Sequence, residues 1–173
     1  MSGNNLMENC SGECEFKFNF PRFQQLPRVP LYKDQVIIYI ENILKPITFN
    51  SKEKILTPTM VNNYVKQKVV AAPVDKKYNE SQVAYLIVIC ILKQVFSITE
   101  VSELLEIQTS SYPIEAAYDY FCTELEKALN SVFCTRNFSE PSSATRTTFE
   151  TEIVRSAVMA FANKVYIQKK LNL

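Results

Sequence analysis

The sequence predicts an all-α protein, and three observations carry that prediction. An unbroken apolar run from Val83 to Leu92 continues through polar neighbours without glycine or proline, which predicts a buried central helix from about Glu80 to Phe96. Apolar residues recur at helical spacing between residues 31 and 44. The same spacing returns from Pro113 to about Phe133 and again from about residue 147 onward. We therefore expect a helical bundle whose two last helices are long.

The N-terminal segment is expected to enter the bundle without regular structure. Residues 1 to about 19 are polar, lack periodicity and are predicted to form a flexible leader. Four aromatic side chains are placed to pack onto the domain: Phe16, Phe18, Phe20 and Phe23. Prolines at 21, 27 and 30 keep the chain extended or turning, because proline disfavours a helix at the residue before it. The first helix is expected over 31–44 and ends before Lys45-Pro46.

A second helix is predicted to begin at Thr57-Pro58, a capping hydroxyl followed by proline at the first helical position. Its residues divide into two faces on a helical wheel. The apolar face carries Met60, Val61, Tyr64 and Val65, and the polar face carries Thr59, Asn62, Asn63, Lys66 and Gln67. The apolar face is expected to pack and the polar face to remain free for recognition. At most a small β-wing is expected near Val69 to Tyr78, before the central helix.

The C-terminal half is expected to add three helices. Ser97-Ile98-Thr99-Glu100 is a capping-box pattern, which predicts a helix start after the central helix. The Thr/Ser-rich stretch 108–112, closed by Pro113, predicts a break. A loop is expected over 136–145, and the last helix is expected to bury a set of residues at four-residue intervals: Phe149, Ile153, Ala157, Phe161 and Val165. The predicted organisation is a leader over 1–19, a domain over 20–107 and a helical region over 108–173.

Composition predicts an ordinary soluble globular chain. It has 173 residues, 47% hydrophobic, with a net charge of +1, so any nucleic-acid surface must come from local charge clustering. The first twelve residues lack an apolar segment, and the central run is shorter than the roughly 20 residues that a membrane span needs. We therefore expect a cytoplasmic protein without membrane contact. The five cysteines are an odd set, so no disulfide framework is expected.

The residue inventory argues against catalysis and cofactor binding. The chain has no histidine, and its two glycines, Gly3 and Gly12, cannot form a phosphate-binding loop. Cys10 and Cys14 have a metal-like spacing, but no second tight cysteine pair completes a tetrahedral site. We expect no enzyme, no metal and no cofactor.

Three blocks in order resemble the DNA-binding module of the mercury-resistance-regulator (MerR) family. The family's Y-E-R-x-G-L-L-P-P-P is approximated by Tyr-Val-Lys-Gln-Lys-Val-Val-Ala-Ala-Pro at 64–73. Its Y-S-x-x-x-L-x-x-L-x-x-I-x-x-L pattern is matched by Tyr78, Val83, Leu86, Ile89 and Leu92, and its F-S-L-x-E-I pattern by residues 96–101. The resemblance implies a winged helix-turn-helix in the N-terminal half.

The sequence departs from that family at the positions that contact DNA. Lys68 stands where the family has glycine at the end of the recognition helix. The family's recognition arginine falls on Asn62 or Asn63, and the wing between Pro73 and Tyr78 is shorter.

From about Pro21 to Leu171 the chain also resembles an uncharacterised bacterial family of unknown function. That resemblance rests on three segments: Leu-Tyr-x-Asp-Gln at 31–35, Leu-Thr-Pro-Thr-Met-Val-Asn-Asn-Tyr-Val-Lys at 56–66 and Ile-Cys-Ile-Leu-Lys-Gln at 89–94. It implies a fold and no activity.

These observations lead to the hypothesis of a sequence-specific DNA-binding protein, a transcriptional regulator that reads double-stranded DNA. The expected contacts to base edges are Asn62, Asn63, Lys66 and Gln67, and the expected contacts to phosphates are Thr59, Lys76, Lys77 and Tyr78. Six lysines against one glutamate and one aspartate give the window 52–77 a net charge of +4. A homodimer is expected, with the C-terminal helices supplying dimer contacts or an effector pocket.

The alternative is a helical protein-interaction domain that keeps the fold without binding DNA and uses an apolar groove between the C-terminal helices. Asparagine and lysine on the outer face of an amphipathic helix are most often only solvated. Tyr64 and Tyr78 fit a core position as well as a contact. An enzyme would need clustered carboxylates and lysines that the sequence does not indicate.

Overall fold

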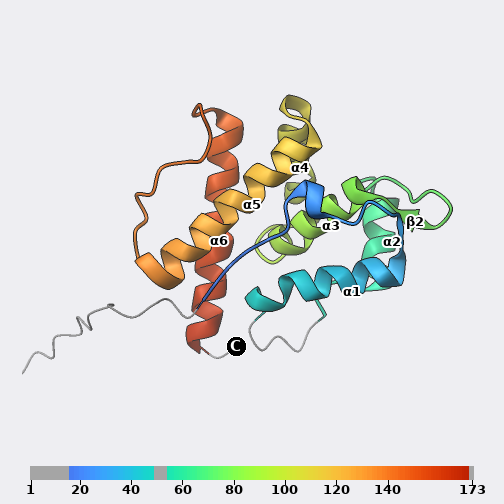
Figure 1. Ribbon diagram of the computed structural model, residues 1–173, viewed down its shortest axis with the longest axis horizontal. Helices are drawn as coiled ribbons and strands as arrows, with labels where there is room; N and C mark the ends of the chain where they lie inside the picture. The colour runs from blue at the N-terminus through green and yellow to red at the C-terminus, as the bar shows by residue number, and fades with distance from the viewer. Residues whose placement is uncertain (1–15, 49–53, 172–173) are drawn as a thin grey trace, which may run out of the picture.

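The computed structural model describes residues 16–48 and 54–171, and these residues are mostly helical (Figure 1). The six α-helices of this described part are α1 (Lys33–Leu44), α2 (Pro58–Lys66), α3 (Glu80–Leu92), α4 (Ile98–Ser111), α5 (Ile114–Asn130) and α6 (Phe149–Leu171). Shorter segments are the 3-10 helices η1 (Phe23–Gln25) and η2 (Lys45–Ile47) and the π-helix η3 (Ser131–Thr135). None of the helices in these ranges is long and apolar enough to cross a membrane. The predicted helical class is confirmed.

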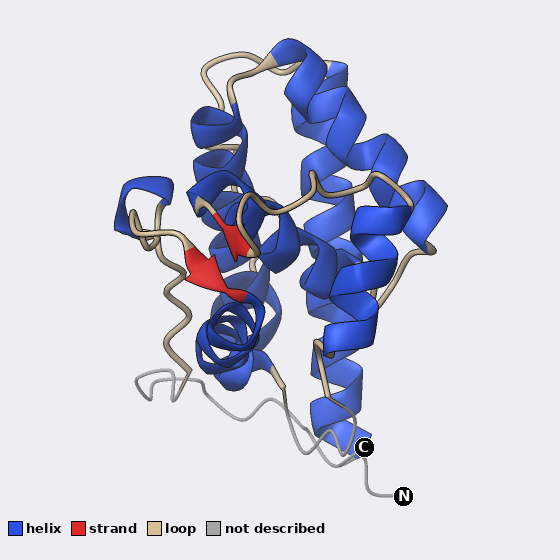
Figure 2. Ribbon diagram, turned by 90° about the vertical axis from the view of Figure 1, so that its right-hand side faces the viewer, coloured by secondary structure: helices blue, strands red, loops and turns tan. Residues whose placement is uncertain are grey.

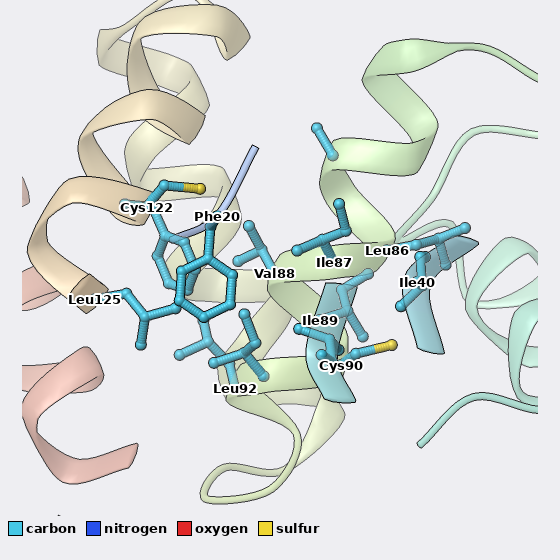
Figure 3. Packing of buried hydrophobic residues seen from close by; sticks show 14 of the residues in the cluster. Phe20, Ile40, Leu86, Ile87, Val88, Ile89, Cys90, Leu92, Cys122 and Leu125 are labelled. Atoms are coloured by element: carbon cyan, nitrogen blue, oxygen red, sulfur yellow. The ribbon is translucent and has the colours of Figure 1, made fainter. Parts of the chain in front are cut away.

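Helix α3 is the centre of the bundle, because it is buried on all sides. Only Glu80, Ser81 and Tyr85 of its thirteen residues are not buried. Ile40 of α1 lies on one side of it, near Leu86, and Phe20 with Leu125 of α5 lies near Val88 and Leu92 on the other (Figure 3). Burying each large side chain of this run stabilises the fold by about 1.5–3 kcal/mol. One hydrophobic cluster therefore spans both predicted halves of the chain.

The helix-start signals of the sequence are confirmed by hydrogen bonds. Thr57 Oγ1 accepts from the backbone N–H of Met60 at 3.2 Å, and Pro58 occupies the first helical position. Ser97 and Glu100 bond each other's backbone N–H groups, at 3.3 and 2.7 Å. Each such cap satisfies a donor that the helix cannot pair internally, worth about 1 kcal/mol.

Three boundaries differ from the expectation. Helix α3 ends at Leu92 because residues 93–95 form a turn, so the predicted extension to Phe96 is wrong. Leu31–Tyr32 is strand β1, which pairs antiparallel with β2 (Lys77–Tyr78), a partner that local periodicity cannot reveal (Figure 2). Helix α4 runs through the predicted boundary at residue 107 and ends at Ser111, so the break falls at Tyr112-Pro113.

The buried face of α6 also differs in part from the predicted stripe. Ala157, Phe161 and Val165 are buried, but Phe149 is 64% exposed. A four-residue interval advances 40° around a helix per step, so a stripe at that interval winds off the packed face.

The N-terminal arm packs across α5. The Arg22 guanidinium binds both carboxylate oxygens of Glu126, at 2.9 and 2.6 Å, and Phe20 N–H donates to the same carboxylate at 2.7 Å. Phe16 and Phe18 contact the ring of Phe133, with ring centres 5.0 and 5.4 Å apart. The expected packing of these aromatic residues is confirmed, whereas residues 1–15 of the predicted leader lie outside the described ranges.

Candidate nucleic-acid interface

Helix α2 divides into the two faces that the sequence predicts. Val61 and Tyr64 are buried, and burial raises the pKa of Tyr64 to about 12. The opposite side is exposed along its whole length: Thr59, Asn62, Asn63, Lys66 and Gln67. A row of hydroxyl, amide and ammonium groups is thus held on one side of a short helix whose other side is fixed by packing.

The end of α2 turns through a left-handed residue. Lys68 has a φ of 59° and lets the backbone N–H groups of Val69 and Val70 return to the carbonyl oxygen of Tyr64, at 3.0 and 3.3 Å. Glycine is the usual residue at this position because a Cβ atom disfavours the left-handed conformation by about 1–2 kcal/mol. The strained position here carries an exposed cation.

A tight hairpin follows α2. Val74 and Lys77 exchange two backbone hydrogen bonds, of 2.8 and 3.1 Å, around the two-residue turn Asp75-Lys76. Both turn residues have positive φ, 49° and 64°, as a two-residue hairpin of this kind requires. Lys76 is exposed at the tip, and β2 joins the hairpin to β1. The hairpin and α2 lie at the same end of the molecule (Figure 1).

Gln82, the third residue of α3, ties the α2–hairpin connection to the core. Its side-chain amide N–H₂ donates to the carbonyl oxygens of Ala71 and Ala72, at 2.9 and 3.0 Å. Its Oε1 accepts from Asn79 N–H at 2.8 Å, and Asn79 Oδ1 accepts from Gln82 N–H at 3.0 Å. The side chain is 6% exposed and fully bonded, so it fixes the path of the chain into the hairpin.

Among the described residues, the cations on this side of the molecule form no ion pair with a carboxylate. The ion pairs found within residues 16–48 and 54–171 involve none of the lysines between 54 and 78. Lys33 Nζ donates to Asn62 Oδ1 at 3.1 Å, and Lys77 Nζ lies 5.0 Å from the centre of the Tyr32 ring. Lys66, Lys68 and Lys76 are exposed. Their charge is therefore directed to solvent, where an anionic ligand can reach it.

Tyr78 does not share this surface. It is 3% exposed, and burial raises the pKa of its hydroxyl. The predicted phosphate contact by Tyr78 is therefore removed from the site, because its ring is part of the hydrophobic core. The other predicted contacts, on α2 and on the hairpin, all retain exposed surface.

Sequence reasoning missed Lys33 and Gln82 as parts of this site. Lys33 precedes Asn62 by 29 residues, and Gln82 reaches back 11 residues to Ala71. The one local signal for Gln82 is that it is a polar residue directly before a long apolar run, where a buried side chain needs hydrogen-bond partners.

Metal-ligating side chains do not cluster in the part of the chain that the structure describes. No group of three or more cysteine, aspartate and glutamate side chains is close enough to hold a metal ion in residues 16–48 and 54–171. Cys90 and Cys122 are free but buried, and burial raises the pKa of Cys122 to about 12. Cys10 and Cys14 lie outside the described ranges.

Comparison with known proteins places the chain in a family. No curated protein and no solved structure matches it. Residues 21–121, more than half of the chain, match the family described as Domain of unknown function (DUF1836). The match covers α1 to α4 and most of the first half of α5, and so includes α2 and the hairpin. The chain belongs to the DUF1836 family.

Proposed function

We propose that this protein binds double-stranded DNA sequence-specifically and acts as a transcriptional regulator. In this proposal α2 enters the major groove, where Asn62, Asn63, Lys66 and Gln67 meet base edges. Thr59, Lys76 and Lys77 meet phosphates on either side of the groove.

The observation that carries the proposal is the exposed row on α2. Asparagine and glutamine amides pair with adenine edges and lysine pairs with guanine, so this face carries the groups that base readout uses. It stands beside lysines that form no ion pair within residues 16–48 and 54–171, and these lysines supply the phosphate attraction that docking needs.

The order of elements supports the same reading. A strand, two helices, a hairpin and a further helix follow one another, which is the order expected from the resemblance to the MerR-type winged helix. Lys68, which stands where that family has glycine, has a left-handed backbone. Lys68 and Lys76 both have left-handed backbone conformations, which glycine would adopt with less strain. Backbone strain of this kind is concentrated at functional sites.

Two variants separate phosphate contacts from base contacts. Lys76→Ala combined with Lys77→Ala is expected to weaken binding to all sequences and to reduce the slope of log affinity against log salt by about 2. Asn63→Ala is expected to cost about 1–3 kcal/mol on the preferred sequence and little on others. Binding that neither variant changes would show that the contact surface lies elsewhere.

A second candidate function is that of a helical protein-interaction domain. It is favoured by an open groove of about 420 Å³ between α4 and α6, whose apolar lining includes Phe96, Leu104, Ile107 and Ile153. Absence of DNA binding at low salt, together with binding of a different protein at this groove, would favour this second function over the first.

A further inference from the structure

Helix α6 carries a stripe of apolar side chains along its outer side, interrupted by Ser156 and Lys164. At 100° per residue, Phe149, Ile153, Ala160, Ile167 and Leu171 point within about 40° of one another, although they span about 33 Å of helix. Phe149, Ile167 and Leu171 are 64%, 54% and 61% exposed, and Ile153 and Ala160 are half-buried. Large apolar side chains this exposed at both ends of one stripe mark an interaction surface.

The stripe is complementary to itself in the antiparallel direction. With Ala160 at the centre, Ile153 lies seven residues before it and Ile167 seven residues after it. Phe149 and Leu171 lie eleven residues before and after. Two antiparallel copies of α6 that cross at Ala160 therefore place each large apolar residue opposite another, and the small alanine lets the helices approach closely at the crossing.

Charge favours the same direction. Beside the stripe, the first turn of α6 carries Glu150 and Glu152, and the last turn carries Lys170. Antiparallel pairing brings the acidic end of one helix to the basic end of the other, whereas parallel pairing would bring like charges together. Glu100 and Glu103 of α4 border the N-terminal part of the stripe and add to the acidic end.

The surface also has room for the partner side chains. The groove of about 420 Å³ between α4 and α6 borders the stripe from Ile153 to Ala160. Its lining includes the small residues Ser156, Ala157 and Ala160. In the antiparallel arrangement the exposed Ile167 of a second copy lies opposite Ile153, at the border of this groove. The protruding side chain of Ile167 in one copy thus meets the groove between α4 and α6 of the other copy.

We infer that two copies of this chain associate through α6 in an antiparallel arrangement, with Ala160 on the two-fold axis. Such an interface is isologous, because Ile153 contacts Ile167 and Ile167 contacts Ile153 across the axis. Helix α6 lies at the end of the molecule opposite to α2 and the hairpin (Figure 1). The dimer therefore leaves α2 and the hairpin uncovered, and the inference stands without DNA binding.

Sedimentation equilibrium of the full chain tests the interface. The protein is expected to have twice the mass of one chain at micromolar concentration. Ile167→Glu is expected to raise the dimer dissociation constant by at least about 30-fold, since each dimer then places two carboxylates against Ile153. Phe138→Glu is the matched control, because Phe138 is equally exposed, at 54%, but lies in the loop between α5 and α6.

The register has its own test. Ile153→Lys combined with Ile167→Glu is expected to restore the dimer, because antiparallel pairing places the new charges opposite each other. Under mild oxidation, Ala160→Cys is expected to cross-link two chains, whereas Ile167→Cys is expected to give no more cross-link than the parent protein with its native cysteines.

The inference would be overturned if the parent protein were still monomeric at about 100 µM. A dimer dissociation constant above about 10⁻⁴ M means that the two copies have negligible affinity for each other. The inference would also be overturned by a dimer that Ile167→Glu and Phe138→Glu leave equally intact, or by cross-linking through Ile167→Cys in place of Ala160→Cys. A monomer that binds DNA would overturn the dimer alone, and a dimer without DNA affinity would overturn the proposed function alone.

Discussion

Lys33 Nζ donates a hydrogen bond to Asn62 Oδ1 at 3.1 Å, which links the first turn of α1 to the exposed face of α2. Because the lysine can only donate, it holds the amide oxygen of Asn62 and leaves the amide N–H₂ facing away as a donor. In the proposed complex that N–H₂ meets an acceptor on a base edge. The bond also adds a cation at the margin of the recognition face.

Lys33→Met is expected to weaken binding to the preferred DNA sequence by about 3–10-fold and to relax the base preference at one position, because the Asn62 amide is then free to rotate. Titration of a set of single-base variants of the preferred site measures both effects. Lys45→Met removes an exposed lysine near the other end of α1 and serves as the charge control. Equal losses for the two variants would contradict a role for the Lys33–Asn62 bond.

Lys76→Gly is expected to lower DNA affinity without lowering the stability of the fold. Glycine relieves the left-handed backbone of the hairpin turn, so the free energy of unfolding is expected to remain equal or to rise by up to about 1 kcal/mol. Loss of the lysine charge is expected to lower DNA affinity and to reduce the salt slope by about 1. Urea unfolding and salt-dependent DNA titration of the same preparation provide the two readouts. A stable variant with unchanged DNA affinity would remove Lys76 from the contact surface.

Gln82→Met is expected to destabilise the fold by about 1–3 kcal/mol, because the part-buried hydrogen bonds to the carbonyl oxygens of Ala71 and Ala72 and the bond from Asn79 N–H are lost. Amide hydrogen exchange at Val74 and Lys77 is expected to accelerate more than exchange in α5, since the hairpin loses its attachment to α3. Gln24→Met, at an exposed glutamine of η1, is expected to change stability by less than about 0.5 kcal/mol. Uniform acceleration across both regions would show that Gln82 has no particular role in holding the hairpin.

Stability is expected to fall at alkaline pH. Burial raises the pKa of the Tyr64 hydroxyl from 10.0 to about 12, so between these values the folded protein binds the proton that the unfolded chain has released. This contribution is fully present below pH 10 and is lost as the pH rises through 12. Urea unfolding from pH 8 to pH 12 measures the decline, and Tyr64→Phe is expected to make it shallower. An identical pH dependence for the parent and this variant would contradict the assignment to Tyr64.

The helical elements could be predicted from sequence because their signals are local. The capping hydroxyls of Thr57 and Ser97 and the apolar run of α3 each determine structure within a few residues. Strand β1 could not be predicted, since Leu31 and Tyr32 are extended through pairing with residues 77 and 78. The end of α3 was misplaced because Phe96 continues the apolar pattern after the helix has turned.

The candidate site could be predicted only in part for the same reason. The division of α2 into two faces depends only on local sequence. The helical wheel therefore predicts its exposed face, including Asn62 and Lys66. From sequence, Tyr78 fits both a phosphate contact and a core position, because a two-residue strand does not reveal which side its residues face. The Lys33–Asn62 and Gln82–Ala71 bonds join distant segments, so only the folded arrangement brings them together.

Binding of the purified full chain to labelled duplex DNA tests the central claim most directly. The measurement is fluorescence anisotropy against a pool of genomic fragments, at low salt and at physiological salt. We expect salt-sensitive binding that persists at physiological salt for a subset of fragments, because base contacts by α2 add to phosphate contacts by the hairpin. Absence of binding even at low salt would contradict the proposed DNA binding and would favour the protein-interaction function instead.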